Sequence, residues 1–126
     1  MIPERHGAFN RCNLYQLVQI PTIAHKGEGL IRFARILTGS DISGECNFMD
    51  FTTMPPGTTI GRHSHGAIEE EYYLILSGNG VMTLEDRSFD ITAGDLIRNP
   101  PGGTHSLRNT GDCDLQLFVF ELRVNA

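Results

Sequence analysis

From residue 45 onward, apolar residues occur in short runs that alternate with polar residues and are separated by glycine, proline, asparagine and aspartate. This pattern is typical of many short antiparallel strands. The runs predict strands at residues 46–53, 58–64, 72–77, 81–85, 89–92, 96–98, 104–108 and 115–124. No stretch in this part of the chain is long and periodic enough for a substantial helix. The sequence therefore predicts an all-β domain, an antiparallel β-barrel or jelly roll.

The first 44 residues are less regular. Residues 10–19 fit either a short strand or a single helical turn, and residues 25–29 are expected to form a loop. Residues 30–37 lie between two glycines and are interpreted as a strand. We expect one domain over residues 1–126, in which residues 1–44 form an N-terminal arm and residues 45–124 carry the barrel.

Two turns are predicted between the middle strands. Asn79-Gly80 lies between two apolar runs and favours a tight hairpin, because both central residues of such a turn must accept a positive φ. Asp86-Arg87 is expected to turn the chain between the next two strands.

Charge and composition exclude several classes of function. The net charge is −5 and the isoelectric point is near 5.4, so no basic stripe is present to bind nucleic acid or a membrane surface. No apolar run approaches the roughly 20 residues that span a bilayer. The N-terminus lacks a signal pattern, so a cytoplasmic location is expected. Cys12, Cys46 and Cys113 are widely spaced and are interpreted as free thiols in a reducing compartment.

Histidines and glutamates in two segments indicate a metal site. His63 lies on the strand predicted at residues 58–64 and His65 directly follows it, so in an extended chain their side chains, two positions apart, emerge on the same face. Three glutamates follow at residues 69–71. His105 opens a strand directly after a rigid loop at residues 99–103, which positions its side chain in advance. Three imidazoles and one carboxylate form a nitrogen and oxygen site for a divalent transition metal, with open positions for substrate or oxygen.

These two segments resemble the paired motifs of the cupin superfamily. In the first segment Gly57 stands six positions before His63, and Gly78 stands seven positions after Glu71. The second segment has the family's spacing without a gap at Gly94, Pro100, Gly102, His105 and Asn109. The resemblance covers residues 57–109, and the short segment between the motifs is similar to that of small single-domain cupins.

The first motif departs from the family pattern at its glutamate. Five residues separate His65 from Glu71, where the family has three or four. Glu69 or Glu70 would restore that gap but would lengthen the distance to Gly78. Neighbouring strand residues face opposite ways, so Glu70 and Glu71 cannot both face the metal. We assign Glu71, because the hairpin expected at Gly78 fixes its register while the preceding loop can absorb an insertion.

The resemblance implies a double-stranded β-helix fold and a metal site formed by His63, His65, Glu71 and His105. Iron, manganese, zinc, nickel and cobalt all suit such ligands. Similar cupins include dioxygenases, decarboxylases, isomerases, lyases, cyclases and non-catalytic binding modules. We expect a metal-dependent enzyme acting on a small oxygen-rich metabolite. The alternative is a module that binds or senses a small molecule or carbohydrate without turnover.

Side-chain alternation suggests two catalytic candidates. If Glu71 points inward, so does Tyr73, whose hydroxyl is then a candidate general acid near the metal. Arg98 lies just before the second motif's loop and is a candidate clamp for a substrate carboxylate. The plain alternatives are a core tyrosine and a solvated surface arginine. His6 and His25 lie in expected loops, have no partner pattern, and are interpreted as solvated.

The outward-facing apolar residues exceed what one small barrel needs to bury, and we therefore predict a homodimer. These residues are Tyr72, Leu74 and Leu76, with either Phe118 and Phe120 or Leu117 and Val119 from the last strand. Alternation on the strand at residues 46–53 sets Phe48 and Asp50 on one face and Met49 and Phe51 on the other, and one of these pairs is expected to line the cavity.

Overall fold

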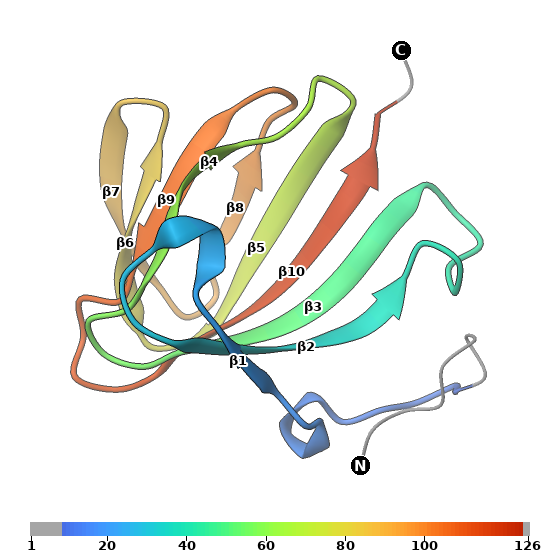
Figure 1. Cartoon of the computed structure of the whole chain (residues 1–126), viewed down its shortest axis with the longest axis horizontal. Coiled ribbons are helices and arrows are strands. Elements are labelled where there is room, and N and C mark those ends of the chain that lie inside the picture. The colour runs from blue at the N-terminus through green and yellow to red at the C-terminus, as the bar shows by residue number, and fades with distance from the viewer. Residues whose placement is uncertain (1–8, 125–126) are drawn as a thin grey trace.

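Two antiparallel sheets pack against each other to form a jelly roll (Figure 1). The computed structural model describes residues 9–124. The larger sheet has the strand order β1 (Ile20–Thr22), β2 (Ile31–Thr38), β3 (Cys46–Met54), β10 (Leu115–Arg123), β5 (Glu69–Ser77) and β8 (Leu96–Asn99). The smaller sheet has the order β4 (Thr59–Ser64), β9 (Thr104–Arg108), β6 (Asn79–Leu84) and β7 (Arg87–Thr92). The two sheets are not joined into a closed barrel, so the all-β jelly-roll prediction is confirmed and the barrel alternative is not.

The core lies between the sheets and follows the side-chain alternation of the strands. On β10, Leu115, Leu117 and Val119 are buried while the residues between them are partly exposed. On β5, Tyr73 and Ile75 are buried in the same way. Met54, Ile60, Met82, Ile91, Ile97 and Leu107 complete the cluster from the other strands. The predicted inward orientation of Tyr73 is therefore confirmed.

At one end of the sandwich the inward-facing residues change from apolar to ionisable. On the inner face of β10, the buried residue next to Val119 is Glu121, two positions later. On the inner face of β5, the buried residue next to Tyr73 is Glu71, two positions earlier. On β9, His105 precedes the core residue Leu107 in the same manner. Buried ionisable groups are costly unless they are paired or bind a metal. The buried ionisable side chains are therefore concentrated at this end of the interior, which makes it the candidate functional site.

A β-bulge on β4 turns the histidines toward the interior. Ile60 pairs with Leu107 and His63 pairs with His105, so one strand uses an extra residue between these pairs. Ile60 is buried in the core, and without the bulge the residue three positions later would face solvent. The bulge therefore allows Ile60 and His63 to share the inner face.

One predicted turn is wrong. Asn79-Gly80 does not form a hairpin, because β5 and β6 belong to different sheets and do not pair. Gly78, with φ 91°, connects β5 in the larger sheet to β6 in the smaller sheet. A Cβ at this position would lie 2.6 Å from the carbonyl oxygen of Asp114, so only glycine fits. The two-residue hairpin turn lies between β6 and β7 at Glu85-Asp86, where Glu85 has φ 55°. The predicted turn at Asp86-Arg87 is therefore displaced by one residue.

The N-terminal segment follows the edge of the larger sheet. Of the two alternatives for residues 10–19, the helical turn is confirmed as the 3-10 helix η1 (Leu14–Gln16). Asn13 caps this helix by accepting a hydrogen bond from the Tyr15 amide. The strand predicted at residues 30–37 is confirmed as β2. The turn η2 (Ala24–Lys26) connects β1 to the region before β2 and packs against β4 (Figure 1). Among residues 9–124, no helix is long and apolar enough to cross a membrane.

Candidate metal centre

Four side chains from three strands meet at the ionisable end of the interior. His63 lies on β4, His65 just beyond it, Glu71 on β5 and His105 on β9. One donor atom from each of the four lies within 4.8 Å of the others. Glu71 Oε1 is 3.2 Å from Nε2 of His65 and 3.2 Å from Nε2 of His105. The residues singled out by the two sequence motifs therefore come together in space.

Of the three consecutive glutamates, the structure places Glu71 in this cluster. Its side chain is 6% exposed, whereas Glu70 faces the other side of β5 and pairs with Arg98 at 2.8 Å. Glu69 bends back and accepts a hydrogen bond from the amide of Gly66 in the preceding loop. That loop absorbs the extra residue of the first motif. The register of Glu71 comes from its pairing with β10 and β8, and not from the hairpin expected at Gly78.

The outer nitrogens of two histidines are already held by hydrogen bonds. His63 Nδ1 lies 2.7 Å from the carbonyl oxygen of Gly61, and His65 Nδ1 lies 3.1 Å from Glu121 Oε1. Glu121 is itself held by the side-chain amide of Asn47 at 2.9 Å. Such contacts fix the tautomer and leave Nε2 of each ring directed at the cluster. Sequence reasoning missed Glu121, because its only signal was an acidic residue on an otherwise apolar inward face.

Two of the inner atoms of the cluster lack hydrogen bonds. His65 Nε2 and Glu71 Oε1 are both buried, and although they are close together they do not meet in hydrogen-bond geometry. Buried polar atoms without partners are rare in folded proteins and call for an explanation. Imidazole nitrogens and a carboxylate oxygen that converge in this way fit a transition-metal ion such as Fe, Mn, Zn, Ni or Co.

Burial and charge set distinct protonation states in this cluster. Hydrogen bonding to Glu121, followed by the proximity of Glu71, raises the pKa of His65 to about 10. Desolvation lowers the pKa of His63 to about 4. Burial alone would raise the pKa of Glu71, but His105 and His65 outweigh it and hold this pKa at about 2. Without a metal, the site therefore holds an ionised Glu71 beside a protonated His65 and a neutral His63 at neutral pH.

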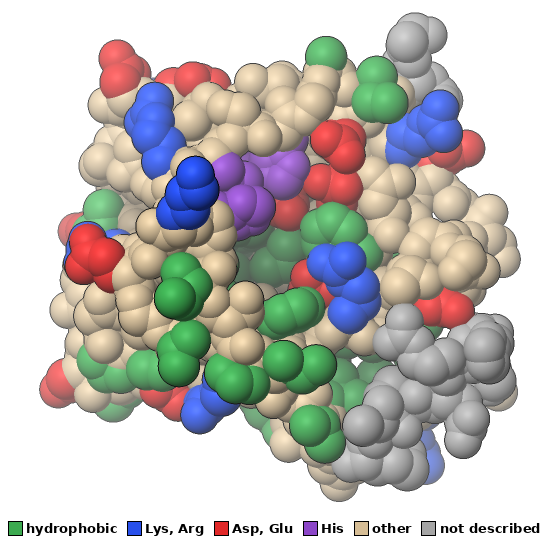
Figure 2. Space-filling model, viewed as in Figure 1, with side chains coloured by type: hydrophobic (Ala, Val, Ile, Leu, Met, Phe, Trp, Pro, Cys, Tyr) green, Lys and Arg blue, Asp and Glu red, His purple; other side chains and the backbone are tan. Residues whose placement is uncertain are grey.

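A cavity of about 290 Å³ opens directly onto the cluster. Figure 2 shows the hollow, with histidine and acidic side chains along its upper edge and hydrophobic side chains below them. Its walls come from the N-terminal segment, from β2 and β3, and from the cluster itself. The lining residues are Thr22, Ile23, Ala24, His25, Ile31, Phe33, Arg35, Phe48, Asp50, Thr52, Ile60, His63, Glu71, Tyr73 and Val119. Of the two expected pairs on β3, Phe48 and Asp50 line it.

Tyr73 lies where the alternation predicts, on the cavity wall. Its hydroxyl is 3.4 Å from Nε2 of His105. Complete burial, together with the nearby charge of Glu71, raises its pKa well above the ordinary value of 10. The hydroxyl is therefore neutral at physiological pH and is a donor beside the cluster rather than a base.

Arg98 is absent from the cavity lining and its side chain is 59% exposed, which agrees with the alternative of a solvated surface arginine. It is on the outer face of β8, opposite Tyr72 in register, and binds Glu70 through Nε and Nη2. The arginine that lines the cavity is Arg35 on β2. Its guanidinium binds Asp50 at 2.8 and 3.0 Å and stacks over the Phe48 ring at 4.3 Å. The sequence placed Arg35 in a strand but gave no sign of which face it occupies.

His25 is exposed, as its interpretation as a solvated residue implies, but the expectation that it has no partner is wrong. It lines the cavity and stacks on His63, with ring centroids 3.5 Å apart and planes 5° from parallel. Desolvation lowers its pKa despite the nearby Glu71. No motif signal pointed to it, since its position depends on how the turn η2 packs against β4. His6, interpreted as solvated, lies outside the described residues.

Comparison with known families identifies the family to which the chain belongs. The family model described as Cupin domain matches residues 50–121. The chain belongs to the cupin domain family. An oxalate-binding protein of Thermotoga maritima is 32% identical to this cupin over 93 residues, which cover 74% of this chain and 76% of that protein. An uncharacterised protein of Methanocaldococcus jannaschii is 39% identical over 65 residues, covering 52% of this chain and 51% of the other.

A solved structure agrees with the same assignment. The crystal structure of a predicted oxalate decarboxylase from Thermotoga maritima superposes on this cupin with a TM-score of 0.84 and 26% sequence identity. The superposition covers 89% of this chain and 97% of the other. The cupin resemblance carried by the two motifs is therefore confirmed.

Proposed function

We propose that this cupin binds one divalent transition metal through His63, His65, Glu71 and His105 and is a metal-dependent enzyme for a small oxygen-rich metabolite. The observation that carries the proposal is the convergence of three imidazoles and one carboxylate beside an open cavity, which His63 and Glu71 help to line. Fe, Mn, Zn, Ni and Co are the candidates, since this donor set suits each of them. An ion held by these four residues would have coordination positions left for a substrate or water.

A bound metal supplies Lewis-acid polarisation of a substrate oxygen or activation of water or oxygen beside the substrate. The chain's own groups account for the rest of the chemistry. Tyr73 holds a neutral hydroxyl near His105 and can donate a proton or a hydrogen bond to a substrate oxygen. The apolar wall formed by Ile31, Phe48 and Val119 limits water at the reacting atoms. Dioxygenase, decarboxylase, isomerase, lyase and cyclase reactions all fit these groups.

Arg35 favours a carboxylate-bearing substrate. Its guanidinium is pre-oriented by Asp50 on one side and Phe48 on the other, so little side-chain entropy is lost when an anion approaches. The Thermotoga relative is named for binding oxalate, a small dicarboxylate. Small carboxylates, beginning with oxalate, are therefore the first substrates to test.

A second candidate function is binding without turnover. The Thermotoga protein is named for binding rather than for catalysis, which favours a module that captures or senses a small molecule. Both candidates require the same metal and the same cavity, and they differ in whether the ligand is changed.

Elemental analysis followed by two assays separates these candidates. We expect one metal ion per chain, heat of binding for a small carboxylate, and substrate loss or oxygen uptake with the same compound. Iron with substrate-dependent oxygen uptake indicates a dioxygenase, and zinc or nickel without oxygen uptake indicates isomerase, lyase or cyclase chemistry. Binding that leaves every tested compound unchanged contradicts the enzyme and favours the binding module.

We further propose that the protein is a cytoplasmic homodimer. The outer face of the larger sheet presents a row of aromatic rings: Tyr72 stacks on Phe120 at 5.0 Å, and Phe118 lies 5.8 Å from Phe120. These rings are partly exposed and offer apolar surface for a second copy. Cys12, Cys46 and Cys113 are all free, which fits a reducing compartment. A monomeric mass by light scattering at micromolar concentration contradicts the dimer.

A further inference from the structure

The turn η2 carries an imidazole onto the face of a proposed metal ligand. His25 and His63 stack with their centroids 3.5 Å apart and their planes 5° from parallel. The other two imidazoles near His63 approach it at steep angles, His65 at 66° and His105 at 71°. Among the described rings, His25 therefore provides the flat surface against which the ring of His63 rests.

The backbone of this turn is strained where it carries His25. His25 has φ 51° and Lys26 has φ 58°, in the left-handed region that residues other than glycine rarely adopt. Such conformations persist only where surrounding contacts enforce them, and they concentrate at functional sites. Here the enforcing contacts come from β4, where the Thr59 amide donates to the Glu28 carbonyl oxygen at 2.9 Å and the Glu28 amide donates to Thr59 Oγ1 at 2.7 Å.

Two glycines allow the turn to lie this close to β4. A Cβ on Gly61 would clash with the carbonyl oxygen of His25, and a Cβ on Gly27 would clash with the carbonyl oxygen of Thr59. Gly61 lies in the bulge of β4, and its own carbonyl oxygen lies 2.7 Å from Nδ1 of His63. The ring of His63 is therefore held at its edge by Gly61 and on its face by His25.

We propose that His25 is a positioning residue of the metal centre. Its ring fixes the plane of His63, so that Nε2 of His63 stays directed at the donors of His65, Glu71 and His105. This inference rests on the proposed metal site, and it adds to that site a residue from the N-terminal segment. A flat ring at position 25 is the property that matters, and a phenyl ring is expected to replace the imidazole.

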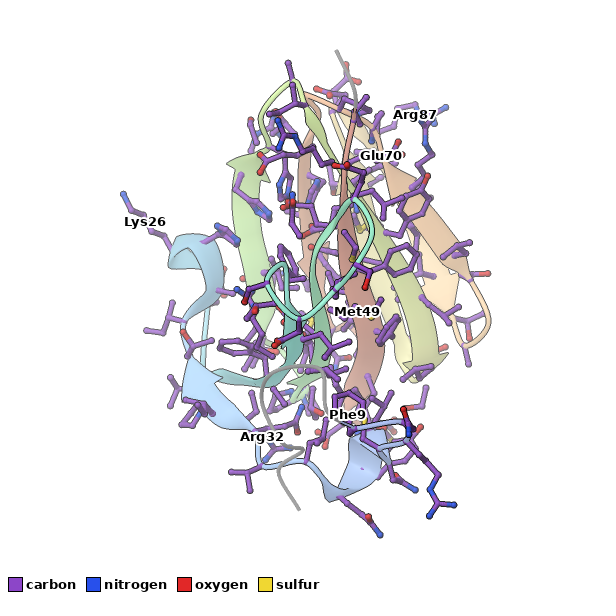
Figure 3. All side chains as sticks on the ribbon, turned by 90° about the vertical axis from the view of Figure 1, so that its right-hand side faces the viewer. Phe9, Lys26, Arg32, Met49, Glu70 and Arg87 are labelled. Atoms are coloured by element: carbon purple, nitrogen blue, oxygen red, sulfur yellow. The ribbon has the colours of Figure 1, made fainter. Side chains whose placement is uncertain are left out.

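Metal affinity is the first test. His25→Ala is expected to weaken the affinity for Co²⁺ or Zn²⁺ about tenfold, as the loss of groups that orient metal ligands does elsewhere, whereas His25→Phe retains it. The matched control is Lys26→Ala, which truncates a neighbouring residue with the same left-handed backbone but a side chain that extends away from the protein (Figure 3). The absorption spectrum of the Co²⁺ protein should change in His25→Ala and remain unchanged in the other two variants.

Ring-proton NMR shifts of His63 in the metal-free protein provide the second test. The stack should displace these resonances upfield in the wild type and in His25→Phe, and the displacement should be lost in His25→Ala. This measurement decides the stacking even if the wild type binds no metal, in which case the proposed function fails on its own. Equal metal affinity, Co²⁺ spectra and His63 shifts in His25→Ala and wild type overturn the inference and leave the proposed function standing. Equal losses in His25→Phe and His25→Ala overturn it as well.

Discussion

Glu121 lies 3.1 Å from Nδ1 of His65 and holds that ring from the strand next to β5. Glu121 is 5% exposed as a whole residue, and the second oxygen of its carboxylate accepts a hydrogen bond from Asn47 on β3. A carboxylate in this position fixes the histidine tautomer and increases the basicity of the opposite nitrogen. Glu121 therefore supports the proposed ligand His65 without belonging to the four-residue cluster itself.

Replacing this carboxylate should weaken the site without destroying it. Glu121→Gln keeps the shape and the contact with Asn47 but removes the charge that holds the His65 proton. We expect metal affinity to fall about ten- to hundredfold, as is typical for the loss of a carboxylate that orients a metal-bound histidine. A chelator-competition titration measures this change. Wild-type affinity in Glu121→Gln would show that His65 does not depend on Glu121.

The raised pKa of His65 predicts how the stability of the metal-free protein depends on pH. The folded pKa is about 10 and the unfolded value is 6.5, so the folded state binds the proton more tightly. This contribution is fully present below pH 6.5 and is lost as pH rises toward 10. The thermal midpoint of the metal-free wild type should therefore fall over this window more steeply than that of His65→Gln. Parallel pH profiles for the two proteins contradict the assignment.

The same proton predicts a pH dependence of metal binding. A histidine must be deprotonated to ligate a metal, so uptake below pH 10 should release the His65 proton into solution. The apparent metal affinity should accordingly rise with pH from 6.5 to 10, opposite in sign to the stability of the metal-free protein. Calorimetry in buffers of different ionisation heat measures the released proton. Metal uptake without proton release at pH 7.5 would be inconsistent with a protonated His65.

Replacing Tyr73 should lower turnover and leave the metal content unchanged. Tyr73→Phe removes only the hydroxyl, which lies 3.4 Å from His105 Nε2. If the hydroxyl acts as general acid, kcat should fall about 100-fold at an unchanged metal content. If the protein only binds its ligand, the loss should be limited to about two- to tenfold in affinity, the effect of one neutral hydrogen bond. Wild-type turnover and affinity would assign Tyr73 to the core alone.

Variants of Arg35 and Arg98 form a matched pair that tests whether an arginine in the cavity binds a substrate carboxylate. Arg35→Gln should weaken carboxylate binding to the metal-loaded protein about ten- to hundredfold, because a charged hydrogen-bond donor leaves the cavity wall. Arg98→Gln should leave binding unchanged, since that side chain pairs with Glu70 on the outer surface. Calorimetric titration with oxalate measures both variants. A larger effect from Arg98→Gln than from Arg35→Gln would reverse this assignment.

The parts of the structure that local patterns determine were predictable from the sequence. Strand alternation placed Tyr73 inward, and the two motif spacings brought together His63 and His105, which are direct register partners on β4 and β9. The Asn79-Gly80 hairpin failed because a turn signal is local, whereas the partner of β6 is set by pairing across the chain with β7 and β9. Glu71 was selected, but its register depends on β8 and β10 rather than on that turn.

Three residues around the site could not be predicted for the same physical reason. His25, Arg35 and Glu121 reach the cluster or its cavity from segments outside both motifs. The position of His25 requires a left-handed turn docked on the β4 bulge, and neither feature has a sequence signature of its own. Arg35 and Glu121 lie on strands whose inward face was recognisable only after the sheets had been assembled.

Metal content in a pair of glutamate variants tests the central claim most directly. Glu71→Ala removes the carboxylate at the centre of the cluster, and Glu70→Ala removes its neighbour on the opposite face of β5. After incubation with Fe²⁺, Mn²⁺, Zn²⁺, Ni²⁺ or Co²⁺ and removal of excess ion, we expect one metal per chain in wild type and Glu70→Ala and a strong loss in Glu71→Ala. Wild-type protein that retains none of these metals, or undiminished metal in Glu71→Ala, would contradict the account.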